Sequence, residues 1–221
     1  MHLWRIFLLS VLLLPSGGPG GKPETQQQYF FTRAQAFEVM REFLDAIRLD
    51  RPENLSLPSY VRERLAWANS ASAAGTLQVN LWDKCEGCSA NDLMGMNFRN
   101  GRFELDVYAP RLLRLMWDEQ RQELHRKPEK RAVNTFLLAV VHETIHMERG
   151  SAYYLSLPSA EERFREEVRA WAITVLNAVR PLRAQLQPLD EDWVKADDIL
   201  AACGDDPACG GFQGFVRAKI K

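Results

Sequence analysis

Residues 137–147 read LLAVVHETIHM, and this segment places the strongest limit on how the chain can fold. It belongs to a predicted helix over residues 130–149, and Gly150 follows in a position where helices commonly end. Apolar side chains occupy several sides of this helix, so we expect it to be buried. The two histidines and the glutamate within it must then be paired or bind something, because a buried ionisable group without a partner is costly.

The spacing of these three groups indicates a metal site. His142 and His146 are one helical turn apart and differ by about 40° in direction, so both imidazoles project into the same space. Glu143 points about 100° away from His142, beside that space. This is the HExxH pattern, in which two neutral imidazoles bind one Zn²⁺ ion and the glutamate takes a proton from its water. The alternative is a pair of buried histidines held by backbone or carboxylate partners without metal.

A third ligand is expected on a second helix. Ser159 and Glu162 form a capping box that begins a helix over about residues 160–179, ending before Pro181. Glu167 borders the apolar stripe of this helix, whereas Glu166 points to the other side. We therefore expect Glu167 to be the ligand and Glu166 to be a surface charge. In the alternative interpretation Glu167 is a solvated carboxylate at the edge of the stripe.

The chain before these helices mixes helix and strand signals. Thr32 and Gln35 form a capping box, and Asn100-Gly101 is the dipeptide best suited to a two-residue hairpin turn. Alternation of apolar and polar residues marks the strands. We expect helices over residues 32–49, 60–70 and 111–125, and strands over residues 76–82, 94–99 and 102–108. This order predicts an α+β fold, with a small sheet before the HETIH helix.

The N-terminal residues have the plan of a secretory signal peptide. A positive start, an apolar run over residues 6–14 and a stretch rich in glycine and proline make up residues 1–21. The apolar run is shorter than the roughly 20 residues that cross a bilayer, which disfavours the alternative of an uncleaved anchor. We expect a polar leader over residues 22–31, a single domain over residues 32–221, no stable membrane insertion after cleavage, and a secreted or periplasmic location.

The four cysteines fit an oxidising compartment. Cys85 and Cys88 lie in DKCEGCS, and Cys203 and Cys209 lie in ACGDDPACG, so we expect two local disulfides. A four-cysteine zinc site is disfavoured because five residues separate the second pair. A thioredoxin-like redox pair at Cys85 and Cys88 is disfavoured because a hairpin signal follows where that fold needs a helix.

Charge limits the class of partner. The chain has 28 Lys and Arg against 29 Asp and Glu, and no basic stretch interleaved with aromatic residues. A nucleic-acid groove needs such a stretch, so nucleic acid is not an expected partner.

HETIH, followed by 20 residues and then Glu167 in EEVRAW, resembles the zincin metallopeptidases of the gluzincin type. The resemblance covers about residues 130–172 and includes the small residue Ala170 three positions after Glu167. It implies a zincin-like fold with a small, mostly antiparallel sheet packed with helices. It also implies that His142, His146 and Glu167 bind one Zn²⁺ ion, that water fills the fourth position and that Glu143 is the general base.

The resemblance further implies a peptide or protein substrate, aligned by an edge strand for which residues 102–108 are the candidate. Tyr153 and Tyr154, in the connection between the two metal helices, are the first candidates for steadying the oxyanion, and Tyr108 and His125 are others. We thus expect a secreted zinc metallopeptidase. The alternatives are a zincin-like binding module without turnover and an exported structural domain held by disulfides without metal. Cleavage preference and oligomeric state are left open.

Overall fold

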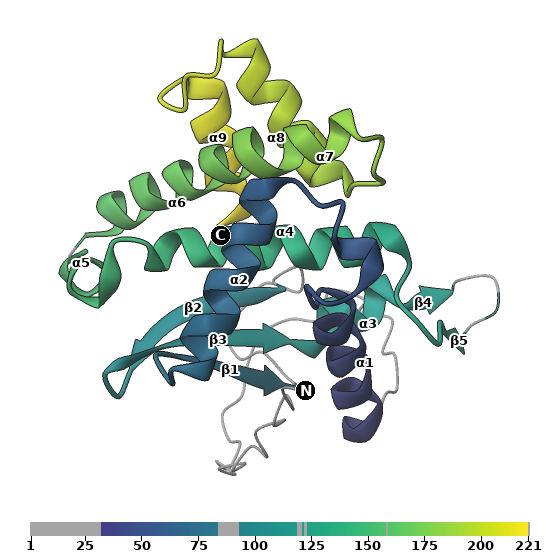
Figure 1. The fold of residues 1–221 in the computed structure, drawn as a ribbon. Helices are drawn as coiled ribbons and strands as arrows, with labels where there is room; N and C mark the ends of the chain where they lie inside the picture. The colour runs from purple at the N-terminus through teal and green to yellow at the C-terminus, as the bar shows by residue number, and fades with distance from the viewer. Residues whose placement is uncertain (1–31, 84–92, 119–120, 122, 158, 221) are drawn as a thin grey trace, which may run out of the picture.

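A long buried helix, α4 (Lys130–Met147), lies at the centre of the protein, as the sequence predicts (Figure 1). Gly150 follows its last turn with a φ of +79°, a conformation that glycine adopts without strain. The structure, a computed structural model, describes residues 32–83, 93–118, 121, 123–157 and 159–220. The predicted signal peptide, the polar leader, and Cys85 with Cys88 lie outside these residues.

On one side of α4, the described residues form a mixed sheet of three strands: β1 (Leu77–Trp82), β2 (Met94–Arg99) and β3 (Arg102–Tyr108). Their order is β1-β3-β2, with β3 antiparallel to β2 and parallel to β1. Asn100 and Gly101 have φ values of 54° and 77°, which confirms the predicted hairpin.

Two expectations about this sheet are wrong. It is mixed rather than mostly antiparallel, because the hairpin turn fixes only the pairing of β2 with β3, and no local turn sets the direction of β1. Residues 102–108 form the central strand, so both sides of β3 already pair within the sheet. This strand therefore has no free edge on which a peptide could align.

The helix predicted over residues 111–125 is also wrong. Helix α3 (Ala109–Leu115) ends early, and two short strands follow it, β4 (Trp117–Asp118) and β5 (Glu123–Leu124). The Asp118 carboxylate accepts a hydrogen bond from the backbone N–H of Arg121 at 3.1 Å. Such a side-chain bond offers the backbone a turn in place of the next helical turn.

The remaining helices cover α4 and the sheet. Helix α1 begins with the predicted capping box between Thr32 and Gln35. Its buried Phe43 packs against Phe136 of α4, with ring centroids 5.4 Å apart. These segments near α4 and the sheet are α1 (Arg33–Ala46), η1 (Pro52–Asn54), α2 (Ser59–Ala73) and α5 (Gly150–Ser156).

Beyond α4, a long helical segment leads into the C-terminal helices. It consists of α6 (Ala160–Thr174), the wider turn η2 (Val175–Val179) and α7 (Arg180–Ala184). The predicted capping box of Ser159 and Glu162 is present. The chain stays helical past Pro181, contrary to the predicted end, because the wide π turn before it accommodates a residue that lacks an N–H.

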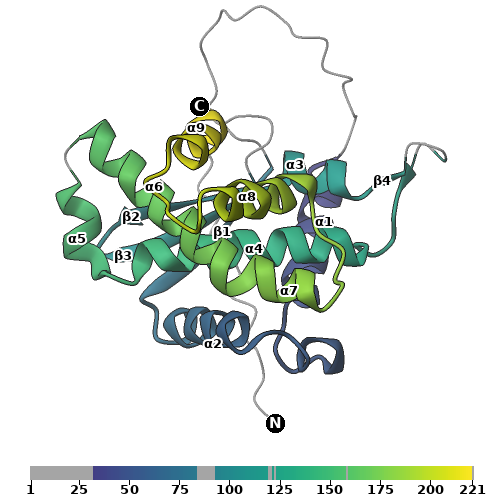
Figure 2. The ribbon, with the colours of Figure 1, turned by 90° about the horizontal axis from the view of Figure 1, so that it is seen from above.

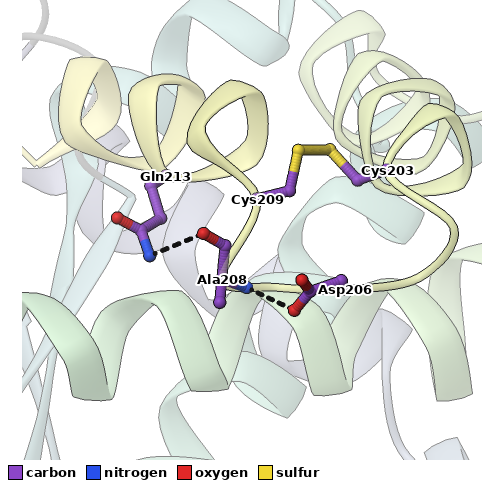
Figure 3. The surroundings of a disulfide bond; sticks show 5 residues. All are labelled: Cys203, Asp206, Ala208, Cys209 and Gln213. Atoms are coloured by element: carbon purple, nitrogen blue, oxygen red, sulfur yellow. Dashed lines mark hydrogen bonds between the residues drawn. A yellow bond between two sulfur atoms is a disulfide. The ribbon is translucent and has the colours of Figure 1, made fainter.

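The C-terminal helices α8 (Glu191–Ala202) and α9 (Gly210–Lys219) lie on the far side of α6 from α4 (Figures 1 and 2). The Cys203–Cys209 disulfide, as predicted, joins the end of α8 to the start of α9 (Figure 3). No helix within the described part of the chain has the length and apolar character needed to cross a membrane.

Candidate metal centre

His142 and His146 of α4 and Glu167 of α6 converge on one point between the two helices. The Nε2 atoms of the two imidazoles lie 3.2 Å apart. The Glu167 carboxylate reaches both rings, with Oε2 3.3 Å from His142 Nε2 and Oε1 3.5 Å from His146 Nε2. The predicted trio is therefore close together, and its members come from two helices that are distant in sequence.

These distances suit a tetrahedral metal ion. With metal–nitrogen bonds of about 2.0–2.1 Å, two ligand atoms at a tetrahedral centre lie about 3.3 Å apart. The two Nε2 atoms lie 3.2 Å apart, close to this value, and each of them has one oxygen of the Glu167 carboxylate within 3.5 Å. Two imidazoles and one carboxylate are also a ligand set found in catalytic zinc sites, which keep a fourth position open. The described residues thus contain a group able to hold one metal ion.

The ligand cluster is buried on its histidine side and partly open at Glu167. His142 and His146 are 7% and 4% exposed, whereas the Glu167 side chain is 30% exposed. Burial raises the pKa of the Glu167 carboxyl, but the contacts with His142 and His146 outweigh it, so the pKa lies below its usual range. Glu167 is consequently in the ionised form that a metal needs.

Glu166 is not the predicted surface charge, because its side chain is 4% exposed. Its Oε1 lies 3.4 Å from Nδ1 of His146, at ion-pair distance but without the alignment of a hydrogen bond. Burial raises the pKa of Glu166, yet contacts with His146 and Arg169 outweigh burial and lower the pKa to about 2. Adjacent glutamates on α6 therefore reach opposite nitrogens of the same imidazole.

Aromatic side chains surround the other histidine. The His142 ring lies 5.5 Å from the Trp171 ring of α6 and 6.4 Å from the Trp193 ring of α8, measured between centroids. Phe215 of α9 packs edge-on against Trp171 at 5.4 Å. His142 Nδ1 is buried and has no hydrogen-bond partner among the residues that the structure describes. Aromatic packing and the Glu167 contact at Nε2 together orient this ring.

The other predicted site residues occupy different surroundings. Glu143 is half-buried on α4, next to His142 in the chain. The Tyr153 hydroxyl donates a hydrogen bond to Oε2 of Glu166 at 3.3 Å, so Tyr153 helps to hold that carboxylate in place. Tyr154 belongs to α5, and its side chain lies outside the described set.

Tyr108 and His125, the other candidates for steadying the oxyanion, contact other parts of the fold. His125 lies 3.6 Å from Oε1 of Glu129, and its backbone N–H donates to the carbonyl of Met116. Tyr108 ends β3, and its hydroxyl approaches Gly95 on β2.

Sequence reasoning missed two contributors to this centre, Glu166 and Arg169. The signal for them was the spacing of three residues between Glu166 and Arg169, which allows an ion pair along one helix.

Comparisons of the chain with protein-family models, with curated proteins and with solved structures found no match, so the interpretation of the centre depends on its geometry.

Proposed function

We propose that the protein is a zinc-dependent metallopeptidase with a zincin-like fold of the gluzincin type. The observation that carries this proposal is the convergence of His142, His146 and Glu167, which offer one ligand atom each within 4.8 Å of one another. The half-buried Glu143, next to His142 in the chain, supplies the general base that the reaction needs.

Each residue has a definite part in peptide hydrolysis. His142, His146 and Glu167 hold the ion. When bound, zinc supplies a Lewis acid that polarises the peptide carbonyl and makes water a stronger acid. Glu143 takes the proton from the attacking water and later returns it to the leaving amine. The partial exposure of Glu167 marks the side on which a substrate reaches the centre.

The proposal includes an exported location, secreted or periplasmic. It is supported by the composition of residues 1–21 and by the Cys203–Cys209 disulfide, since disulfides persist in oxidising compartments.

Metal analysis and one substitution test the function. The purified mature protein should contain one equivalent of zinc and should cleave labelled unfolded casein. Glu143→Gln should keep the zinc and lose at least about 100-fold in cleavage rate, because general-base catalysis contributes at least this much. Glu38→Gln, a substitution of an exposed glutamate on α1, is the matched control and should cleave like the parent.

The rival functions give different results. Zinc binding with no cleavage by the parent protein would favour a binding module that keeps the site without turnover. Absence of zinc, and no uptake of it at neutral pH, would favour a structural domain in which the histidines pack without metal.

A further inference from the structure

Two carboxylates flank the His146 ring. Glu167 lies on the Nε2 side, 3.5 Å away, and Glu166 lies on the Nδ1 side, 3.4 Å away. Both His146 and Glu166 are 4% exposed at their side chains, so little water competes for this contact. A neutral imidazole that uses Nε2 as a ligand carries its proton on Nδ1. The buried carboxylate of Glu166 is the acceptor beside that nitrogen, at ion-pair distance though without the alignment of a hydrogen bond.

We propose that Glu166 is a positioning residue, which holds the His146 ring in the tautomer and orientation that bind metal. The proposal rests on the metal centre proposed above. Carboxylates behind metal-bound histidines act in this way, because they fix the ring and strengthen it as a ligand. Glu166 touches neither the metal position nor a substrate and acts only through His146.

Glu166 is itself held firmly. The guanidinium of Arg169 donates two hydrogen bonds to it, from Nε to Oε2 at 2.9 Å and from Nη2 to Oε1 at 2.6 Å. Tyr153 of α5 donates a third bond, to Oε2. The same Nη2 of Arg169 also donates to the backbone carbonyl of Ile145, next to His146 in α4. The carboxylate is thus fixed relative to the helix that carries the ligand.

A further hydrogen bond, to Glu148, holds Arg169 in place. Glu148 accepts hydrogen bonds from Arg169 at 3.5 Å and from Arg64 of α2 at 2.8 Å. Besides α6 itself, residues of the three helices α2, α4 and α5 therefore determine where Glu166 points. His142 differs, because the rings of Trp171 and Trp193 pack beside it. Loss of the Glu166 charge should consequently act on one ligand and leave the other in its aromatic surroundings.

Zinc affinity and a cobalt spectrum test the proposal. Glu166→Gln keeps the size of the side chain and removes its charge. We expect the zinc dissociation constant, measured by competition with a chromophoric chelator, to rise by about 10- to 100-fold. The visible absorption of the Co²⁺-substituted protein should change, because the field from His146 changes. Glu161→Gln, at an exposed glutamate of the same helix, should match the parent in both measurements.

The possible results distinguish the proposed role of Glu166 from the proposed metal centre. A parent protein that binds neither zinc nor cobalt would overturn both. If the parent binds metal and a folded Glu166→Gln variant has the same zinc affinity and cobalt spectrum, only the role of Glu166 is overturned. This holds even if the melting temperature of the metal-free variant is lower than that of the parent. If Glu166→Gln does not fold, Arg169→Lys tests the same contact by breaking the two-pronged bond while keeping the charge. Its zinc dissociation constant should rise about tenfold, and an unchanged value would overturn the proposal.

Discussion

The rings of Trp171 and Trp193 lie 4.3 Å apart between centroids, although one residue belongs to α6 and the other to α8. Both rings also lie within 6.4 Å of the His142 ring. Through this pair the C-terminal helices contact His142, which lies 51 positions before Trp193 in the chain. The aromatic contact therefore couples the packing of the C-terminal helices to the geometry of the centre.

Trp193→Ala should be strongly destabilising. Trp193 is 6% exposed, and removal of its indole leaves a cavity beside His142. We expect the free energy of unfolding of the metal-free protein to fall by about 3–5 kcal/mol in urea titrations. Trp67→Ala is the control, because Trp67 on α2 is 39% exposed, and it should cost less than half as much. Equal losses in the two variants would contradict the packing role of Trp193.

The disulfide at the α8–α9 connection should stabilise these C-terminal helices. It closes a short loop, since Cys203 and Cys209 are six positions apart. From the chain entropy of a loop of this size, replacing both cysteines by alanine should lower the free energy of unfolding by about 2 kcal/mol. Thermal melting of the double variant beside the parent measures this, and an unchanged midpoint would contradict it. The double variant is preferable to a reductant, which would also reduce the disulfide predicted for Cys85 and Cys88.

Apart from Glu167, which was predicted from helix phase and from the resemblance, the features that were predicted correctly depend on residues close together in the chain. The capping boxes at Thr32 and Ser159 each involve a partner three residues away, and the Asn100-Gly101 turn needs only its own two positions. The two histidines of HETIH likewise share one helix. Short-range chemistry of this kind is readable from the sequence because the partner is always present.

The features that were predicted wrongly depend on segments that meet only in the folded protein. Glu166 was expected in solvent, but α4 and Arg169 enclose it. On β3, Glu104 and Asp106 alternate with apolar residues and are 5% and 2% exposed, a burial that alternation alone does not predict.

Neighbouring strands explain the burial of Asp106. Its carboxylate accepts hydrogen bonds from Asn80 on β1 and from Asn97 and Arg99 on β2. Alternation on a strand shows which residues share a face, but the neighbouring strands decide what that face contacts. The same limit explains why the parallel pairing of β1 with β3 could not be predicted.

Two glycine substitutions should change stability in opposite directions. Gly101 has a φ of +77° in the hairpin turn, so Gly101→Ala should lower the free energy of unfolding by about 1 kcal/mol through backbone strain. Gly214 lies within α9, is exposed, and has open space around its Cα. Gly214→Ala should therefore raise the free energy of unfolding by about 0.5–1 kcal/mol. Urea titrations of both variants measure these changes, and the same sign in both would contradict the turn geometry.

Metal should stabilise the folded chain through the three ligands together. Zinc that binds the folded state alone, at a free concentration 100 times its dissociation constant, should raise the free energy of unfolding by about 2.7 kcal/mol. Addition of a strong chelator should reverse the gain. Glu167→Ala should abolish it, because two histidines alone leave the ion with an incomplete set of protein ligands, whereas Glu161→Ala on the same helix should retain it in full. Thermal melting with and without zinc measures each case. A zinc-dependent gain that survives in Glu167→Ala would show that the third ligand comes from elsewhere in the chain.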